Sequence, residues 1–140
     1  MRRWGMLVRG GQRRCVSVAL HHKELIVWQK AHKLTLEVYS ATKSFPKEET
    51  YGITSQLRRA ALSVAANLAE GGARRSRKEF AQFVSLARGS ASEVAYLLLV
   101  AKDLGYLSNE RYLHLSDGYD HVSRMLTKLL KALSHEPPIQ

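Results

Sequence analysis

The chain has one cysteine, three prolines and no long uninterrupted apolar run. A single thiol, Cys15, cannot close an internal disulfide or build a thiolate metal site, so we expect the protein to fold in a reducing cytoplasm. The longest apolar stretch, Val94 to Ala101, is much shorter than the roughly 18 residues that cross a bilayer. We therefore expect no membrane-spanning helix and no membrane partner.

Motifs for metal binding and catalysis are also lacking. Glu110 and His114, or His114 and His121, could share a helix face, but no Glu-x-x-His tetrad occurs, and we interpret these histidines as solvated or partly packed. There is no nucleophile elbow. Gly71-Gly72 follows a predicted helix, whereas a phosphate-binding loop follows a strand. The sequence predicts no metal, no cofactor and no enzymatic activity.

What the sequence does contain is helical periodicity. The 140 residues are 45% hydrophobic and 24% charged, an ordinary globular composition. Apolar residues recur at steps of three and four residues in four segments, which predicts helices over about 23–43, 53–71, 76–104 and 108–135. Pro46 and Gly105 are expected to end two of these helices, and Gly71-Gly72 to form a flexible cap after a third. Ser76, with Glu79 in a capping box, and Ser108 are expected to begin the last two. Short connections predict an all-α, antiparallel up-and-down four-helix bundle.

The bundle is expected to occupy residues 23–135, with 136–140 as a disordered C-terminus. Residues 1–22 hold five arginines and no acidic residue, without helical period. We interpret them as a disordered basic tail. The alternatives are a transit peptide and a translation start near Val16 or Val18 that would omit the segment.

Positive charge is concentrated between the second and third helices. The net charge is +10, and residues 58–88 hold seven basic residues against two acidic ones. Cations at the start of a helix oppose its dipole, so their presence there indicates an anionic ligand, unless the turn is simply solvated. The expected phosphate contacts are Arg74, Arg75, Arg77 and Lys78, with Arg58, Arg59 and Arg88 as secondary candidates.

A second surface is expected to bind another copy of the chain. The second helix carries small and polar residues on one face. This face is expected to pack against a second subunit; the alternative is that it is simply exposed to solvent. In the third helix, Gly89 is expected to permit close helix approach. The candidate interface residues are Gln56, Ser63, Asn67 and Glu70.

Several segments together resemble one family. They are LIVWQKAHKL (25–34), FPKEETYGITSQLRRAALSVAANLAEG (45–71), SRKEFAQFVSLARGSASEV (76–94) and AKDLGYLS (101–108). This combination is similar to the 23S rRNA-intervening sequence proteins, which are four-helix bundles often encoded within insertions in bacterial ribosomal RNA genes. The family also resembles the accessory protein of diversity-generating retroelements, a basic homopentamer that works with a reverse transcriptase and nucleic acid.

The resemblance implies a non-catalytic homo-oligomer, a pentamer by analogy, that meets nucleic acid with its cationic segment. Our leading hypothesis is nucleic-acid binding, with RNA favoured, directed to the backbone with little sequence choice. The alternative is a protein-interaction scaffold or adaptor, for example for a reverse transcriptase.

Overall fold

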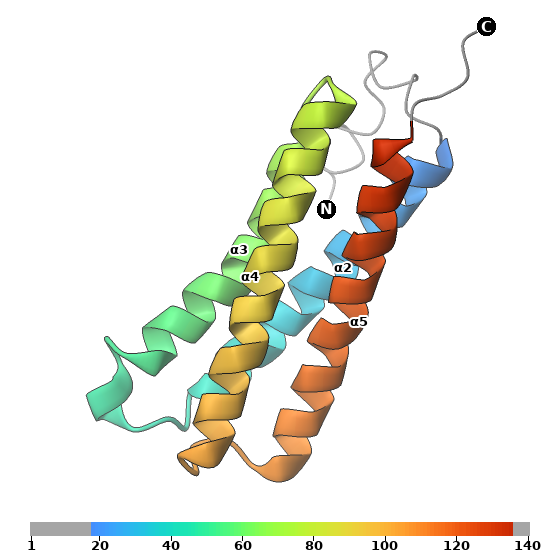
Figure 1. Cartoon of the computed structure of the whole chain (residues 1–140). Coiled ribbons are helices and arrows are strands. Elements are labelled where there is room, and N and C mark those ends of the chain that lie inside the picture. Colours follow the sequence, from blue (N-terminus) through green and yellow to red (C-terminus); the bar gives the residue numbers. More distant parts are fainter. Residues whose placement is uncertain (1–17, 136–140) are drawn as a thin grey trace, which may run out of the picture.

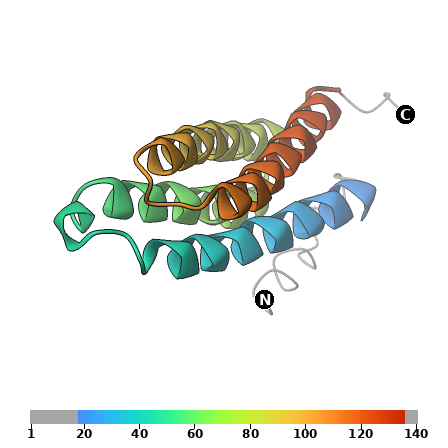
Figure 2. The same ribbon diagram turned by 90° about the horizontal axis from the view of Figure 1, so that it is seen from below.

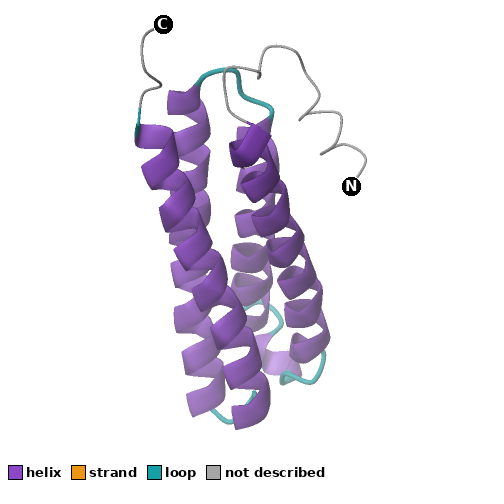
Figure 3. Ribbon diagram, turned by 90° about the vertical axis from the view of Figure 1, so that its right-hand side faces the viewer, coloured by secondary structure: helices purple, strands orange, loops and turns teal. Residues whose placement is uncertain are grey.

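The part of the chain that the structure describes is an all-α bundle of four long helices. A computed structural model describes residues 18–135, with side chains described from Ile26 onward. The helices are α2 (Val18–Thr42), α3 (Ile53–Gly72), α4 (Arg77–Asp103) and α5 (Asn109–Ser134), with a short 3₁₀ turn, η2 (Lys47–Glu49), before α3. The described residues contain no strand (Figure 3). The predicted fold class is confirmed.

Successive helices lie side by side and run in opposite directions (Figure 1). Hydrogen bonds fix their register: Ser63 in α3 meets Ser90 in α4, and Glu37 in α2 meets His114 in α5. Seen along the bundle, α2 and α3 form one layer, and α4 and α5 the other (Figure 2). The start of α2, the α3–α4 turn and the end of α5 therefore meet at one end of the molecule, which we call the basic end.

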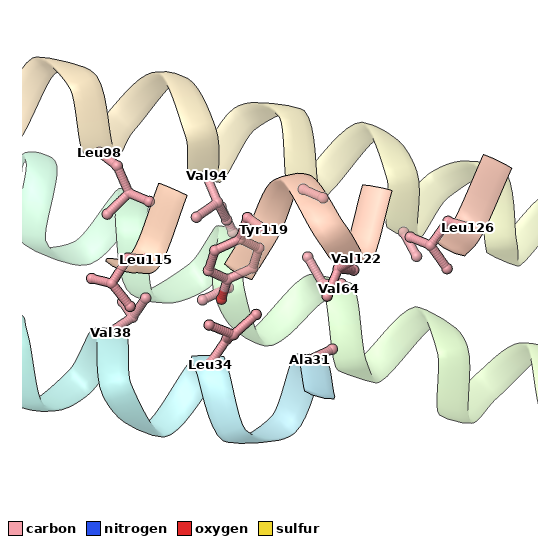
Figure 4. Packing of buried hydrophobic residues seen from close by; sticks show 14 of the residues in the cluster. Ala31, Leu34, Val38, Val64, Val94, Leu98, Leu115, Tyr119, Val122 and Leu126 are labelled. Carbon is pink, nitrogen blue, oxygen red and sulfur yellow. The ribbon is translucent and has the colours of Figure 1, made fainter. Parts of the chain in front are cut away.

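The core contains buried side chains from all four helices, and Figure 4 shows part of it from close by. Each helix contributes an apolar stripe at three- and four-residue spacing, and the largest fully buried side chains include Tyr119, Leu57, Leu68 and Leu126. Burial of each such side chain contributes about 1.5–3 kcal/mol. The buried Thr35 hydroxyl donates to the Ala31 carbonyl at 2.8 Å.

The helix starts follow from local chemistry. The Ser76 hydroxyl accepts a hydrogen bond from the Glu79 amide at 3.0 Å, and the Ser108 hydroxyl accepts one from the Arg111 amide at 3.1 Å. Both caps were predicted. Gly105 follows the C-terminal end of α4 and has a φ of 80°, a backbone conformation that favours glycine.

The first helix begins at Val18, five residues before the predicted start. No proline or glycine lies between residues 18 and 22, so nothing in the local sequence interrupts the helix there. The predicted tail over residues 1–17 and the predicted C-terminal segment 136–140 lie outside the described residues.

One prediction about glycines was wrong, and a second finds no support within the protomer. Gly71 and Gly72 are buried in the last turn of α3 instead of forming a flexible cap after it. A Cβ at Gly71 would lie 2.8 Å from the Phe83 Cβ, so this glycine is the one that allows α3 and α4 to approach closely. A Cβ at Gly89 would meet nothing within 4 Å, so Gly89 makes no close helix approach within the protomer.

Among the described helices, α4 alone is long and apolar enough, by length and composition, to cross a membrane. Its apolar residues include eight that pack in the bundle core, from Phe80 to Ala101. Arg88 and Glu93 interrupt it midway. Core helices of soluble proteins commonly have this composition, so this feature is weak evidence of membrane insertion.

Candidate nucleic-acid interface

The basic turn comprises Arg74 and Arg75, which follow α3, and Arg77 and Lys78, which begin α4. It lies at the basic end of the bundle (Figure 1). The side chains of Arg75 and Lys78 are exposed, and neither side chain forms an ion pair or hydrogen bond with another described residue. Exposed cations without a carboxylate partner are available to bind an external anion.

Arg77 has a different role. Its guanidinium donates to the Ala132 carbonyl and to the His135 carbonyl, each at 2.8 Å, at the end of α5. The last carbonyls of a helix have no partner within that helix, and a cation there is favourable for the helix dipole. Because α4 and α5 are antiparallel, Arg77 stabilises the end of α5 while it opposes the dipole of α4. Its presence therefore does not require an external anion.

Arg74 is also held by the protein's own groups. Its guanidinium lies 3.4 Å from the Glu70 carboxylate and 4.8 Å from the centre of the Phe83 ring. The ion pair is half-exposed and contributes little stability, but it neutralises part of the charge. Arg74 is therefore less available to an external anion than Arg75 or Lys78.

The three secondary candidates lie away from the basic turn. Arg58, in the first half of α3, stacks on Tyr39 at 4.7 Å and donates from Nε to the Thr42 hydroxyl at 2.8 Å. Arg59 is exposed in the same half of α3. Arg88, in the middle of α4, points to α5 and donates to the Thr127 hydroxyl at 3.4 Å. The seven candidates do not form one continuous surface.

The fold separates charge along the bundle axis. The half with the basic turn, residues 18–30, 62–90 and 122–135, holds ten basic and three acidic residues. The opposite half, residues 31–61 and 91–121, holds seven basic and eight acidic residues. An asymmetric field of this kind orients a polyanion toward one end of the molecule.

Part of this positive charge comes from α5, which sequence reasoning missed. Lys128 and Lys131 are exposed near the end of α5 and have no carboxylate partner among the described residues. Arg124 is neutralised by Asp120 at 2.6 Å. The signal in the sequence was that all three acidic residues of α5 fall in its first half and three of its four basic residues in its second.

The candidate interface residues lie along the seam between α3 and α4. The Ser63 hydroxyl lies 2.8 Å from the Ser90 hydroxyl, and the Asn67 amide donates to the Ser63 hydroxyl at 2.9 Å. Their hydrogen-bonding capacity is thus used partly within the protomer. Gln56 is exposed beside an open hollow that Arg59 and Ser63 also line, and Glu70 pairs with Arg74.

The histidines and tyrosines outside the basic turn have separate local environments. Among the described residues, no cluster of three His, Cys, Asp or Glu side chains could hold a metal ion. The His114 Nε2 atom lies 2.8 Å from the Glu37 Oε1 atom, and this is its one side-chain hydrogen bond among the described residues. Burial raises the pKa of Tyr119 above its usual range. A hydrogen bond to Glu49 raises the pKa of Tyr106.

The family model of the 23S rRNA-intervening sequence proteins matches residues 23–128, most of the chain. This chain belongs to that family. The match to the 23S rRNA-intervening sequence proteins begins within α2, includes the whole basic turn and ends at Lys128 in α5.

A solved structure from the S23 ribosomal protein family of Bacteroides thetaiotaomicron, a protein of unknown function, is similar to this chain. The TM-score is 0.73 at 22% identity, and the alignment covers 78% of this chain and 98% of that one. At this identity the likeness supports the helical fold alone. No curated protein matches the sequence.

Proposed function

We propose that this protein is a non-catalytic, oligomeric bundle of the cytoplasm that binds nucleic acid, RNA in preference, with its basic end. The observation that carries the proposal is the pair Arg75 and Lys78, which are exposed and lack an acidic partner. Lys128 and Lys131, exposed near the end of α5, add positive charge to the same half of the bundle. Phosphates neutralised by such side chains release counterions, which drives association.

Binding to the sugar–phosphate backbone is favoured over base-specific readout at these cations. The aromatic residues nearest the basic turn are Phe80, which is buried, and Phe83, which lies under Arg74. Neither is free to stack on a base. The preference for RNA is supported by the ribosomal RNA context that the family's description names.

Self-association would strengthen weak phosphate contacts by presenting several basic ends to one strand. The outer face of α4 supports a subunit contact, because Leu86, Tyr96 and Leu99 are 56%, 65% and 38% exposed there. A ring of copies, five by the resemblance to the retroelement accessory protein, would bury these side chains. Gln56 and Glu70, on the adjoining face of α3, remain candidates for the rim of that contact.

The test is fluorescence anisotropy with labelled RNA and with DNA of the same sequence at about 50 mM salt. The Arg75→Ala/Lys78→Ala double variant is compared with Lys43→Ala/Lys47→Ala, which removes the same charge at the opposite end. We expect RNA affinity to fall at least about tenfold in the first variant and less than about threefold in the second. Equal losses in the two variants would contradict a localised interface.

The alternative function, a protein-interaction scaffold, is supported by the same exposed apolar residues on α4. If α4 contacts a different protein, Tyr96→Glu would abolish capture of that protein and leave the oligomeric state unchanged. If it contacts another copy, Tyr96→Glu would reduce the mass measured by light scattering. Neither result of the Tyr96→Glu experiment affects the interpretation of the anisotropy test with Arg75→Ala/Lys78→Ala.

A further inference from the structure

A groove opens beside the basic turn, between the first turns of α4 and the last turn of α5. Its volume is about 540 Å³, a size typical of sites for small molecules. Ala81 and Leu133 form an apolar floor, and Arg77 and Lys78 line the end nearest the turn. Gln82 and Ser85 complete the wall along α4.

We infer that this groove holds an unpaired nucleotide, so that the protein prefers single-stranded to double-stranded RNA. The inference rests on the proposed function, because the cations beside the groove are those proposed to bind phosphate. Two cations are placed where they could bind successive phosphates of an RNA strand. Lys78 lines the groove, and Arg75 lies three residues earlier on the exposed turn. A phosphodiester backbone that follows these cations would leave a base facing the apolar floor.

The polar groups of the groove suit a base more than a second protein helix. The side chains of Gln82 and Ser85 are exposed, and neither side chain forms a hydrogen bond with another described residue. An amide and a hydroxyl can both donate and accept, as the Watson–Crick edge of an unpaired base requires. In a duplex this edge is already paired and turned inward, so only phosphates could reach this surface.

Arg77 provides a planar surface at the end of the groove. Its guanidinium is fixed by the carbonyls of Ala132 and His135, and it lines the groove while making these bonds. Guanidinium planes are among the surfaces on which unpaired bases stack in protein–RNA complexes. The groove can therefore bind a base without an aromatic side chain.

The test fills the groove without removing charge. Ser85→Trp places a bulky side chain in the wall, and Ser92→Trp makes the same change at an exposed site two turns further along α4. Anisotropy at fixed salt is measured with a labelled single strand of about 12 nucleotides and with the duplex of the same sequence. Circular dichroism and thermal melting establish that both variants fold.

We expect wild-type protein to bind the single strand more tightly than the duplex. Ser85→Trp should weaken single-strand binding by about fivefold or more, the effect of losing one base contact, and change duplex binding less than about twofold. Ser92→Trp should leave both unchanged. Equal binding of the two RNAs, or equal effects of Ser85→Trp on both, would overturn the groove and leave the cationic surface standing. Absence of binding to either RNA would instead refute the proposed function, and the groove inference with it.

Discussion

Arg77 is predicted to stabilise the protein, although it lies where a cation opposes the dipole of its own helix. Arg77→Ala removes two hydrogen bonds of 2.8 Å to the Ala132 and His135 carbonyls. Bonds of this kind to a charged donor contribute about 1.5–3 kcal/mol each when well shielded. His135 is exposed and water can replace part of the interaction, so we expect a total loss of about 1–2 kcal/mol.

The opposing effect is smaller. Removing one cation from the start of α4 should gain only about 0.3–1 kcal/mol at an exposed site. The sign of the change in the free energy of unfolding therefore decides which effect is larger: stabilisation of the end of α5 or destabilisation of the start of α4. At the middle of the two ranges the net loss is about 0.8 kcal/mol. It should lower the melting temperature by about 3 °C, at about 4 °C for each kcal/mol in a domain of this size.

The assay is urea unfolding followed by circular dichroism, at one protein concentration because self-association would raise the apparent stability. Lys78→Ala is the matched control: it lies one residue away, is exposed and has no partner, so its change should stay within about 0.5 kcal/mol. Both bonds come from the Nη2 atom of Arg77. Arg77→Lys should recover only part of the loss, since the lysine side chain is one bond shorter and its ammonium is more strongly hydrated. An Arg77→Ala protein as stable as wild type, or more stable, would refute this reasoning.

Three further substitutions test the packing. Gly71→Ala should destabilise the fold by about 1–3 kcal/mol, because its Cβ would lie 2.8 Å from the Phe83 Cβ. Gly89→Ala should leave the free energy of unfolding unchanged or raise it by up to about 1 kcal/mol, because nothing lies within 4 Å of the added atom; calorimetry of both variants would contradict the account if their order were reversed. Tyr119→Phe should be neutral or stabilising by up to about 1 kcal/mol, because the buried hydroxyl lacks a hydrogen-bond partner in the described structure. A loss above about 2 kcal/mol in guanidinium unfolding would show that this hydroxyl is satisfied in solution.

The helices were predictable because local chemistry and apolar spacing agree. Leu115, Tyr119, Val122 and Leu126 recur at three- and four-residue steps, and all four are buried in α5. Ser108 caps that helix as its position before the periodic segment predicted. The start of α2 was less accurate because residues 18–22 contain neither a cap nor a breaker that marks a boundary.

The candidate site was predictable only in part, because charge in a bundle is distributed by topology. Counting along the chain identified the basic turn but not Lys128 and Lys131, which lie more than 40 residues away in sequence. Nor could it distinguish Arg75 from Arg77. The two differ only in direction: one faces solvent and the other meets carbonyls 55 and 58 residues later in the chain.

The account is tested most directly by the salt dependence of RNA binding, measured by anisotropy between about 50 and 200 mM salt. For a single strand, each lost phosphate contact should reduce the slope of log K against log salt by about 0.7. We predict a slope shallower by about 1.4 for Arg75→Ala/Lys78→Ala and unchanged for Lys43→Ala/Lys47→Ala. The same slope for all three proteins would contradict the assignment of the basic end as the nucleic-acid interface.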